Sequence, residues 1–178
     1  MSNYGSPVFP KSVSFVTAVA EYPVGTRRTD SAGNEYVYGC NASANSIFYP
    51  GVPGVVTNAM TGHSFTVTNA ASQVGLVAAV CHHATIPTGN YGWFMTRGLC
   101  RAVPDSSQVE MAAGEYLAVG VDGGFVSGAC GTAMFQTGLV FGLAVESIVT
   151  GYGSCASEAT SGLGCLGRAW INCNYPMQ

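Results

Sequence analysis

Charge is what this chain has least of. Asp, Glu, Lys and Arg make up 8% of its 178 residues, whereas a soluble domain typically carries about 25%. None of these four residue types occurs between Glu35 and Arg97. Ser, Thr, Asn, Gly and backbone groups must therefore wet much of the surface. We interpret such a surface as suited to permanent contact with other protein.

Clustered basic residues and long apolar runs are also missing. The net charge is −3, and the one basic pair is Arg27-Arg28, whereas nucleic-acid binding needs clustered Lys and Arg that displace counterions from phosphates. We interpret that pair as a solvated hairpin flank or a salt bridge to a neighbouring subunit. The apolar runs Val74–Cys81 and Gly138–Val145 are far shorter than the roughly 20 residues that span a bilayer. The sequence therefore predicts no nucleic-acid partner and no membrane partner.

Paired cysteine motifs are a third absence. The 7 cysteines are an odd number and include no C-x-x-C pair, so neither a zinc site nor a fully paired disulfide framework is predicted. Most of them are interpreted as small buried side chains. The exception is Cys155 with Cys165, which flank a loop of Ser, Glu, Thr and Gly. A disulfide between these two would close that loop in an oxidising environment.

Short β-branched and aromatic runs, broken by Gly, Asn, Asp or Pro, dominate the rest of the chain. This rhythm predicts many antiparallel strands and an all-β fold, a single-domain antiparallel barrel or sandwich over residues 23–178. Val74–His82 is apolar on both faces and is predicted to be a central strand. A hairpin is predicted around Asp122-Gly123-Gly124. The other expected strands are 35–38, 64–68, 91–98, 138–146 and 168–173.

Two local expectations are more specific. In the strand at 91–98, period-two alternation places Tyr91, Trp93, Met95 and Arg97 on one face, with Gly92 and Gly98 on the other, where a neighbouring backbone or ring has room. Residues 108–113 are expected to form a short helical turn.

The N-terminal segment has few turn signals of its own. Its apolar stretch Val13–Ala20 ends Ala-Val-Ala, like a signal-peptidase site, but contains Ser14 and Thr17. We therefore expect residues 1–22 to form an ordered N-terminal arm, not a cleaved leader. The arm is predicted to reach a partner through its aromatic and proline residues Tyr4, Pro7, Phe9 and Pro10.

Candidate catalytic and metal-binding groups are sparse. Cys81-His82-His83 places a thiol beside two imidazoles, and Cys81 with His83 could share a face at a strand end. Asn90 or Asp105 would then have to orient the histidine. His63, His82 and His83 have no metal-ligand spacing. The acids are interpreted as turn and solubility residues: Asp30, Glu35, Asp105, Glu110 and Asp122. We expect no catalytic residue, no metal and no cofactor.

Aromatic residues leave sugar binding open. Exposed tryptophan and tyrosine rings can stack on sugars, and the chain has 9 tyrosines and 2 tryptophans. Trp93 and Trp170 are nevertheless interpreted as core or hairpin aromatics.

The order of the segments resembles that of small β-rich head decoration (cement) proteins of tailed bacteriophages. The resemblance rests on turn glycines and one aromatic strand. The segments that carry it are Pro23–Thr26 with Asp30–Tyr38, Gly89–Gly98 with its Gly-x-Tyr-Gly-Trp step, Ala112–Leu117 with Asp122–Gly124, and Phe141–Glu146. It implies a non-enzymatic protein on the virion surface, assembled in the host cytoplasm. Such a protein binds the outside of the shell of major capsid protein, commonly as a homotrimer.

Three function classes therefore remain: a capsid decoration protein, a phage tail or surface module that binds glycans, and an enzyme that uses Cys81.

Overall fold

The computed structural model describes residues 11–43, 47–56, 64–66, 77–104, 110–119, 125–127, 142–149 and 167–173. Within these ranges the regular elements are strands and there is no helix, so no helix there is long and apolar enough to cross a bilayer. The strands are β1 (Arg27–Thr29), β2 (Glu35–Asn41), β3 (Pro53–Val56), β4 (Ser64–Thr66), β5 (Val77–Cys81), β6 (Tyr91–Ala102), β7 (Glu110–Met111), β8 (Tyr116–Val119), β9 (Phe125–Ser127), β10 (Gly142–Ala144), β11 (Ile148–Val149) and β12 (Gly167–Asn172).

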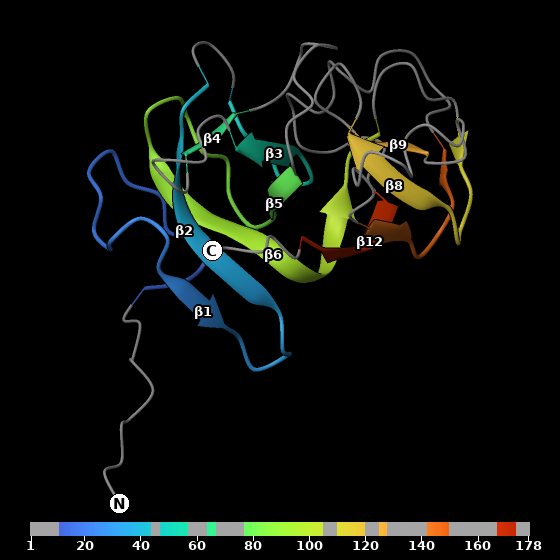
Figure 1. The fold of residues 1–178 in the computed structure, drawn as a ribbon, viewed down its shortest axis with the longest axis horizontal. Helices are drawn as coiled ribbons and strands as arrows, with labels where there is room; N and C mark the ends of the chain where they lie inside the picture. Colours follow the sequence, from blue (N-terminus) through green and yellow to red (C-terminus); the bar gives the residue numbers. More distant parts are fainter. Residues whose placement is uncertain are drawn as a thin grey trace, which may run out of the picture.

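Ten of these strands form one sheet. Its order is β1-β2-β4-β3-β5-β6-β12-β10-β8-β9, and β2 also pairs with β6, so the first part of the sheet folds back on itself. The pairs are antiparallel except β2 with β4. Figure 1 shows the long strand β6 running from the group that holds β1 to β5 toward the group that holds β12, β8 and β9. The all-β prediction is confirmed.

Most of the predicted strands are present. Val77–Cys81 lies between β3 and β6, as predicted for a central strand. Strands β8 and β9 pair antiparallel, with Val119 opposite Phe125, which confirms the predicted hairpin. The helical turn expected over 108–113 is wrong, because Glu110 and Met111 pair with Val149 and Ile148. A cross-strand partner far along the chain outweighed the local preference for a turn.

Two groups of buried side chains hold the sheet together. The first cluster includes Tyr36, Tyr38, Trp93 and Met95 and continues under β12, β10 and β8 through residues such as Ile171. The second cluster consists of Val37, Phe48, Val52, Ala79, Cys81, Ile86 and Phe94. Successive residues of β2, β5 and β6 belong alternately to the two clusters, because neighbouring side chains of a strand point to opposite faces.

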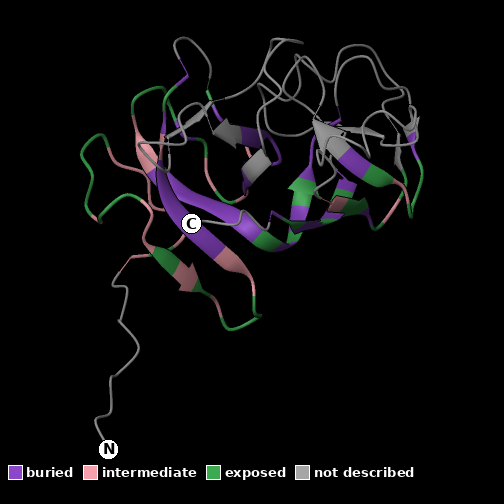
Figure 2. Cartoon of the chain, in the orientation of Figure 1, coloured by how far each residue is buried: buried purple, intermediate pink, exposed green. Residues whose placement is uncertain are grey.

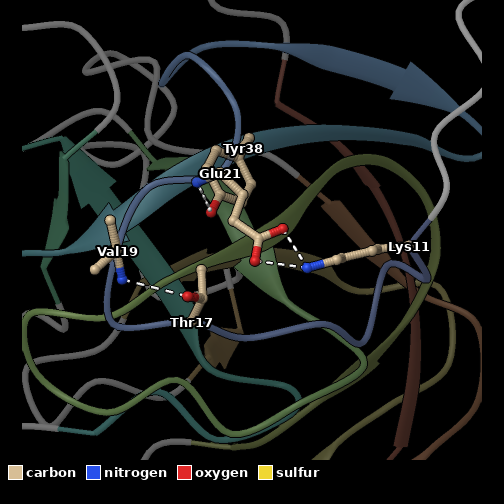
Figure 3. Close-up of polar contacts among 5 residues, drawn as sticks. All are labelled: Lys11, Thr17, Val19, Glu21 and Tyr38. Carbon is tan, nitrogen blue, oxygen red and sulfur yellow. Dashed lines mark hydrogen bonds and ion pairs between the residues drawn. The ribbon is translucent and has the colours of Figure 1, made fainter.

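The segment Lys11–Tyr22 packs against the sheet. Thr17 exchanges two backbone hydrogen bonds with Tyr91 of β6, and the Tyr22 ring lies edge-on to the Tyr38 ring at 5.2 Å between centroids. Figure 3 shows Lys11 in an ion pair with Glu21, whose backbone N–H donates to the Tyr38 hydroxyl at 3.3 Å. This part of the predicted arm therefore contacts its own domain.

Strand β6 contains one irregularity that changes the expected faces. Glu35 lies opposite Arg97 while the next residue, Tyr36, lies opposite Met95, so Thr96 is an extra residue. An extra residue reverses the inside-outside alternation. Arg97 is therefore exposed while Trp93 and Met95 are buried, and the prediction that all three share a face is wrong.

Both glycines of β6 lie close to neighbouring groups, but these are the side chains of Ile86 and Asn34 and not the predicted backbone or ring. The bulge at Thr96 also places the two glycines on opposite faces, whereas one shared face was predicted. A Cβ on Gly92 would lie 2.7 Å from Cδ1 of Ile86. Gly98 has φ +131°, and a Cβ there would lie 2.1 Å from Oδ1 of Asn34. Gly98 is thus the point just after the bulge where only a residue without a side chain fits.

Candidate binding surface

Strand β12 separates a buried face from an exposed face. Gly167, Ala169 and Ile171 are buried, whereas Arg168, Trp170 and Asn172 are exposed. Ala169 and Ile171 belong to the first cluster. Because successive side chains of a strand point to opposite faces, their apolar side chains fix which face of β12 meets the core. Trp170 is therefore directed away from the core, on the outer face of the sheet.

Trp170 is one of four exposed apolar residues that stand side by side. Leu99 of β6 lies opposite Trp170, Trp170 lies opposite Leu143 of β10, and Leu143 lies opposite Tyr116 of β8. Their exposed fractions are 37%, 47%, 38% and 51% in that order. Directly opposite residues share a face of the sheet, at about 5 Å between neighbours. We call these four residues the apolar row.

Arginines border the apolar row. Arg101 and Arg168 lie opposite each other on one side of it, and Arg97 lies opposite Asn172 on the other. All three are exposed, and they are half of the 6 Lys and Arg residues in the chain. The exposed Val145 adjoins Arg168, because its N–H donates to the Arg168 carbonyl at 2.9 Å.

Two of the bordering arginines are already neutralised. Nε and Nη2 of Arg168 both donate to Oε2 of Glu146, at 3.0 and 2.9 Å, and this hydrogen bonding lowers the pKa of the Glu146 carboxyl and raises that of Arg168. Nη1 of Arg97 lies 3.2 Å from Oε1 of Glu35. Within the described ranges Arg101 has no ion pair.

The Cys81-His82-His83 segment is not arranged as a nucleophile and base. The Cys81 side chain is buried, its thiol donates to the Ala84 carbonyl at 2.9 Å, and burial raises its pKa. His83 instead contacts the Tyr36 hydroxyl through Nε2 at 3.0 Å. Of the two residues considered for orienting a histidine, Asn90 accepts a bond from the Asn41 N–H through its backbone carbonyl, and Asp105 lies outside the described residues.

Asp30, Tyr36 and His83 instead form a connected polar group. The Tyr36 hydroxyl donates to Oδ2 of Asp30 at 3.1 Å, because a carboxylate only accepts, so His83 must donate to the Tyr36 oxygen through Nε2–H. Burial, and next the Asp30 charge, raise the pKa of Tyr36. Burial raises the pKa of Asp30, but hydrogen bonds from Asn34, Tyr36 and Ala32 together lower it more.

Both histidines of the segment are held neutral. Burial, followed by the neighbouring His83 and Arg101, lowers the pKa of His82 to about 4. Burial also lowers the pKa of His83. The His82 Nδ1 accepts a long hydrogen bond of 3.4 Å from the Arg101 N–H, so it is the other ring nitrogen that carries the proton.

The remaining predicted sites fall into two groups. Trp93 is 2% exposed, which confirms its interpretation as a core aromatic, whereas Trp170 is on the exposed face and is not a core residue. Asp30 accepts the N–H groups of Ala32 and Asn34, as expected of a turn residue. The residues outside the described ranges, or without a described side chain, are Tyr4, Pro7, Phe9, Pro10, His63, Glu110, Asp122, Cys155 and Cys165. Within the described ranges no cluster of three or more His, Cys, Asp and Glu residues could hold a metal ion.

Sequence reasoning missed Leu99, Leu143 and Tyr116. Alternation in Gly167–Asn172 would have directed Trp170 outward, because Ala169 and Ile171 flank it as core residues. For Leu99, Leu143 and Tyr116, no local sequence pattern indicated that they would share an exposed face. Comparison of the chain with protein-family models, with curated proteins and with solved structures finds no match.

Proposed function

We propose that this chain is a non-enzymatic structural protein that binds a protein shell, as a decoration or cement protein on the outside of a bacteriophage head. The partner is the major capsid protein, the assembled form is a homotrimer, and the location is the virion surface after assembly in the host cytoplasm. The phage assignment rests on the sequence resemblance alone. The structure supports the more general part, which is binding to another protein.

The apolar row is the observation that carries the binding role. Protein interfaces are enriched in tryptophan, tyrosine and arginine, with an apolar centre and a polar border. The four residues of the apolar row provide that centre, and the three arginines beside it provide that border. Fully burying one large apolar side chain contributes about 1.5–3 kcal/mol. The four residues are already about half-buried, so covering each would contribute roughly half of that.

The state of the Cys81 thiol supports a role without catalysis. A cysteine nucleophile reacts as the thiolate and requires an electropositive, partly exposed setting. Cys81 is buried and its pKa is raised, which keeps the group as a neutral thiol.

Glycan binding by a tail or surface module is the second candidate. The exposed rings of Trp170 and Tyr116 favour it, because aromatic faces stack on sugar rings. The residues between and beside them, Leu143 and Leu99, are aliphatic and offer no hydrogen bonds to hydroxyl groups. This composition favours a protein partner.

The copy number of the chain in purified particles tests the proposal. Quantitative mass spectrometry would measure it relative to the major capsid protein of the source. A ratio near one is the expected result for a decoration protein. A ratio far below one would replace the proposal with a tail or adhesin part, and absence from particles would overturn it.

A further inference from the structure

The charge balance beside the apolar row is incomplete. Arg101 and Arg168 lie directly opposite each other, and like charges in opposite positions destabilise a sheet. Glu146 neutralises Arg168 through two hydrogen bonds. In the described part of the chain no carboxylate plays this role for Arg101, so one positive charge remains at the border of the row.

This charge restricts what can cover the row. A partner that buries Leu99 and Trp170 also removes water from the neighbouring Arg101. A guanidinium that loses water without gaining a partner costs several kcal/mol. A well-fitting partner must therefore supply an acceptor, and a carboxylate suits the planar guanidinium because it accepts two parallel hydrogen bonds.

The two described carboxylates beside the row already have partners. Glu146 is engaged with Arg168 and Glu35 with Arg97. A second copy of the chain would bring the same two carboxylates, already engaged with their own arginines. The acceptor is best supplied by a different protein.

We propose that the shell protein presents to the apolar row an apolar surface bordered by an Asp or Glu that pairs with Arg101. This inference rests on the proposed function and specifies the chemistry of its contact. Trp170 is the apolar anchor of the contact and Arg101 its ionic anchor. Arg97 and Arg168 keep their internal ion pairs.

The test compares two charge reversals on the full chain. The probe is a shell assembled from the major capsid protein of the source without this chain. Arg101→Glu is expected to weaken shell binding at least about tenfold, because it places two carboxylates together. The matched control is Arg27→Glu, the same change at an exposed arginine of β1, and it should leave binding within about twofold.

A reciprocal change makes the test specific. Replacing the contacting shell carboxylate by Lys should restore binding of the Arg101→Glu protein. Thermal unfolding of Arg27→Glu should match the parent, because Arg27 is exposed. Arg101→Glu should unfold at the parent's temperature or slightly above it, because it replaces the like-charge pair with Arg168 by an opposite-charge pair.

The outcomes separate this inference from the function on which it rests. If the parent binds shells and Arg101→Glu binds equally well, the ionic anchor is wrong and the function stands. If the parent does not bind shells, both are overturned. Glycan-array binding that depends on Trp170 but not on Arg101, or self-association lost with Arg101→Glu, would replace the shell protein by a glycan or by a second copy.

Discussion

The two halves of strand β6 lie in different environments. From Gly92 to Thr96 every residue is buried, whereas from Arg97 to Ala102 exposed and buried residues alternate. In Figure 2 buried residues run along β2 and the first part of β6, and exposed ones are interspersed further along β6 and on β12. The first half is covered on both faces, and the second half on one.

The covering elements explain this difference. Beside the first half, Tyr22 and Val13 of the N-terminal segment pack on one cluster, and Val16 packs on the other. Beside the second half, β12 and β10 continue the sheet and bury only the side chains that face the first cluster. One strand thus contributes to the core on both faces in its first half and presents an exposed face in its second half.

The largest expected effect concerns the two tryptophans, one in each environment. Trp93 is 2% exposed and Trp170 is 47% exposed. Trp93→Ala should lower the free energy of unfolding by about 3–5 kcal/mol, because it leaves a cavity in the core. Trp170→Ala should lower it by less than about 1 kcal/mol. Urea unfolding followed by circular dichroism would measure both.

Shell binding should show the opposite order: among variants that are folded, it should depend on Trp170 and not on Trp93. Trp170→Ala is expected to lose shell binding while its unfolding curve stays near that of the parent. Equal loss of stability in the two variants would mean that Trp170 is part of the core, and the division of β6 into two environments would be wrong.

The bulge between the two halves gives a second, smaller effect. Gly98→Ala should destabilise the fold by about 1–3 kcal/mol, because φ is +131° and the new Cβ would clash with Asn34, which is itself held by Asp30. Gly33→Ala is the matched control, since φ there is +81° but nothing lies within 4 Å of the new Cβ. Thermal unfolding would compare them, and equal shifts would show that Gly98 matters only through its backbone angle.

Local patterns predicted much of the sheet from the sequence. Aromatic and β-branched runs that follow turn residues predicted β2 and β6, and turn residues at Asp122-Gly123-Gly124 predicted the pairing of β8 with β9. The apolar row was not predictable in the same way. Its members are far apart in the chain, and they meet only through the registers of three strand pairs. The position of Arg97 was mispredicted for a related reason, because a one-residue bulge at Thr96 leaves no mark on the alternation.

The smallest expected effect concerns His82, which follows β5 and accepts a hydrogen bond from Arg101, and so joins the two regions. Its pKa is about 4 in the folded protein, because of burial and next His83 and Arg101, with Asp30 acting in the opposite direction. In the unfolded chain the pKa of His82 is near 6.5. Between about pH 6.5 and pH 4 the unfolded chain therefore binds more protons at His82 than the folded protein does. Stability should fall as the pH drops through that window.

At pH 5 the loss assigned to His82 should be about 1–2 kcal/mol relative to pH 7. Urea unfolding of the parent and of His82→Gln at both pH values would measure it. The variant should lose less stability than the parent, while His83, whose pKa is also lowered, contributes equally to both proteins. Identical losses would mean that His82 is solvated in the folded protein, and that the contact between β5 and the end of β6 is looser than the hydrogen bond to Arg101 implies.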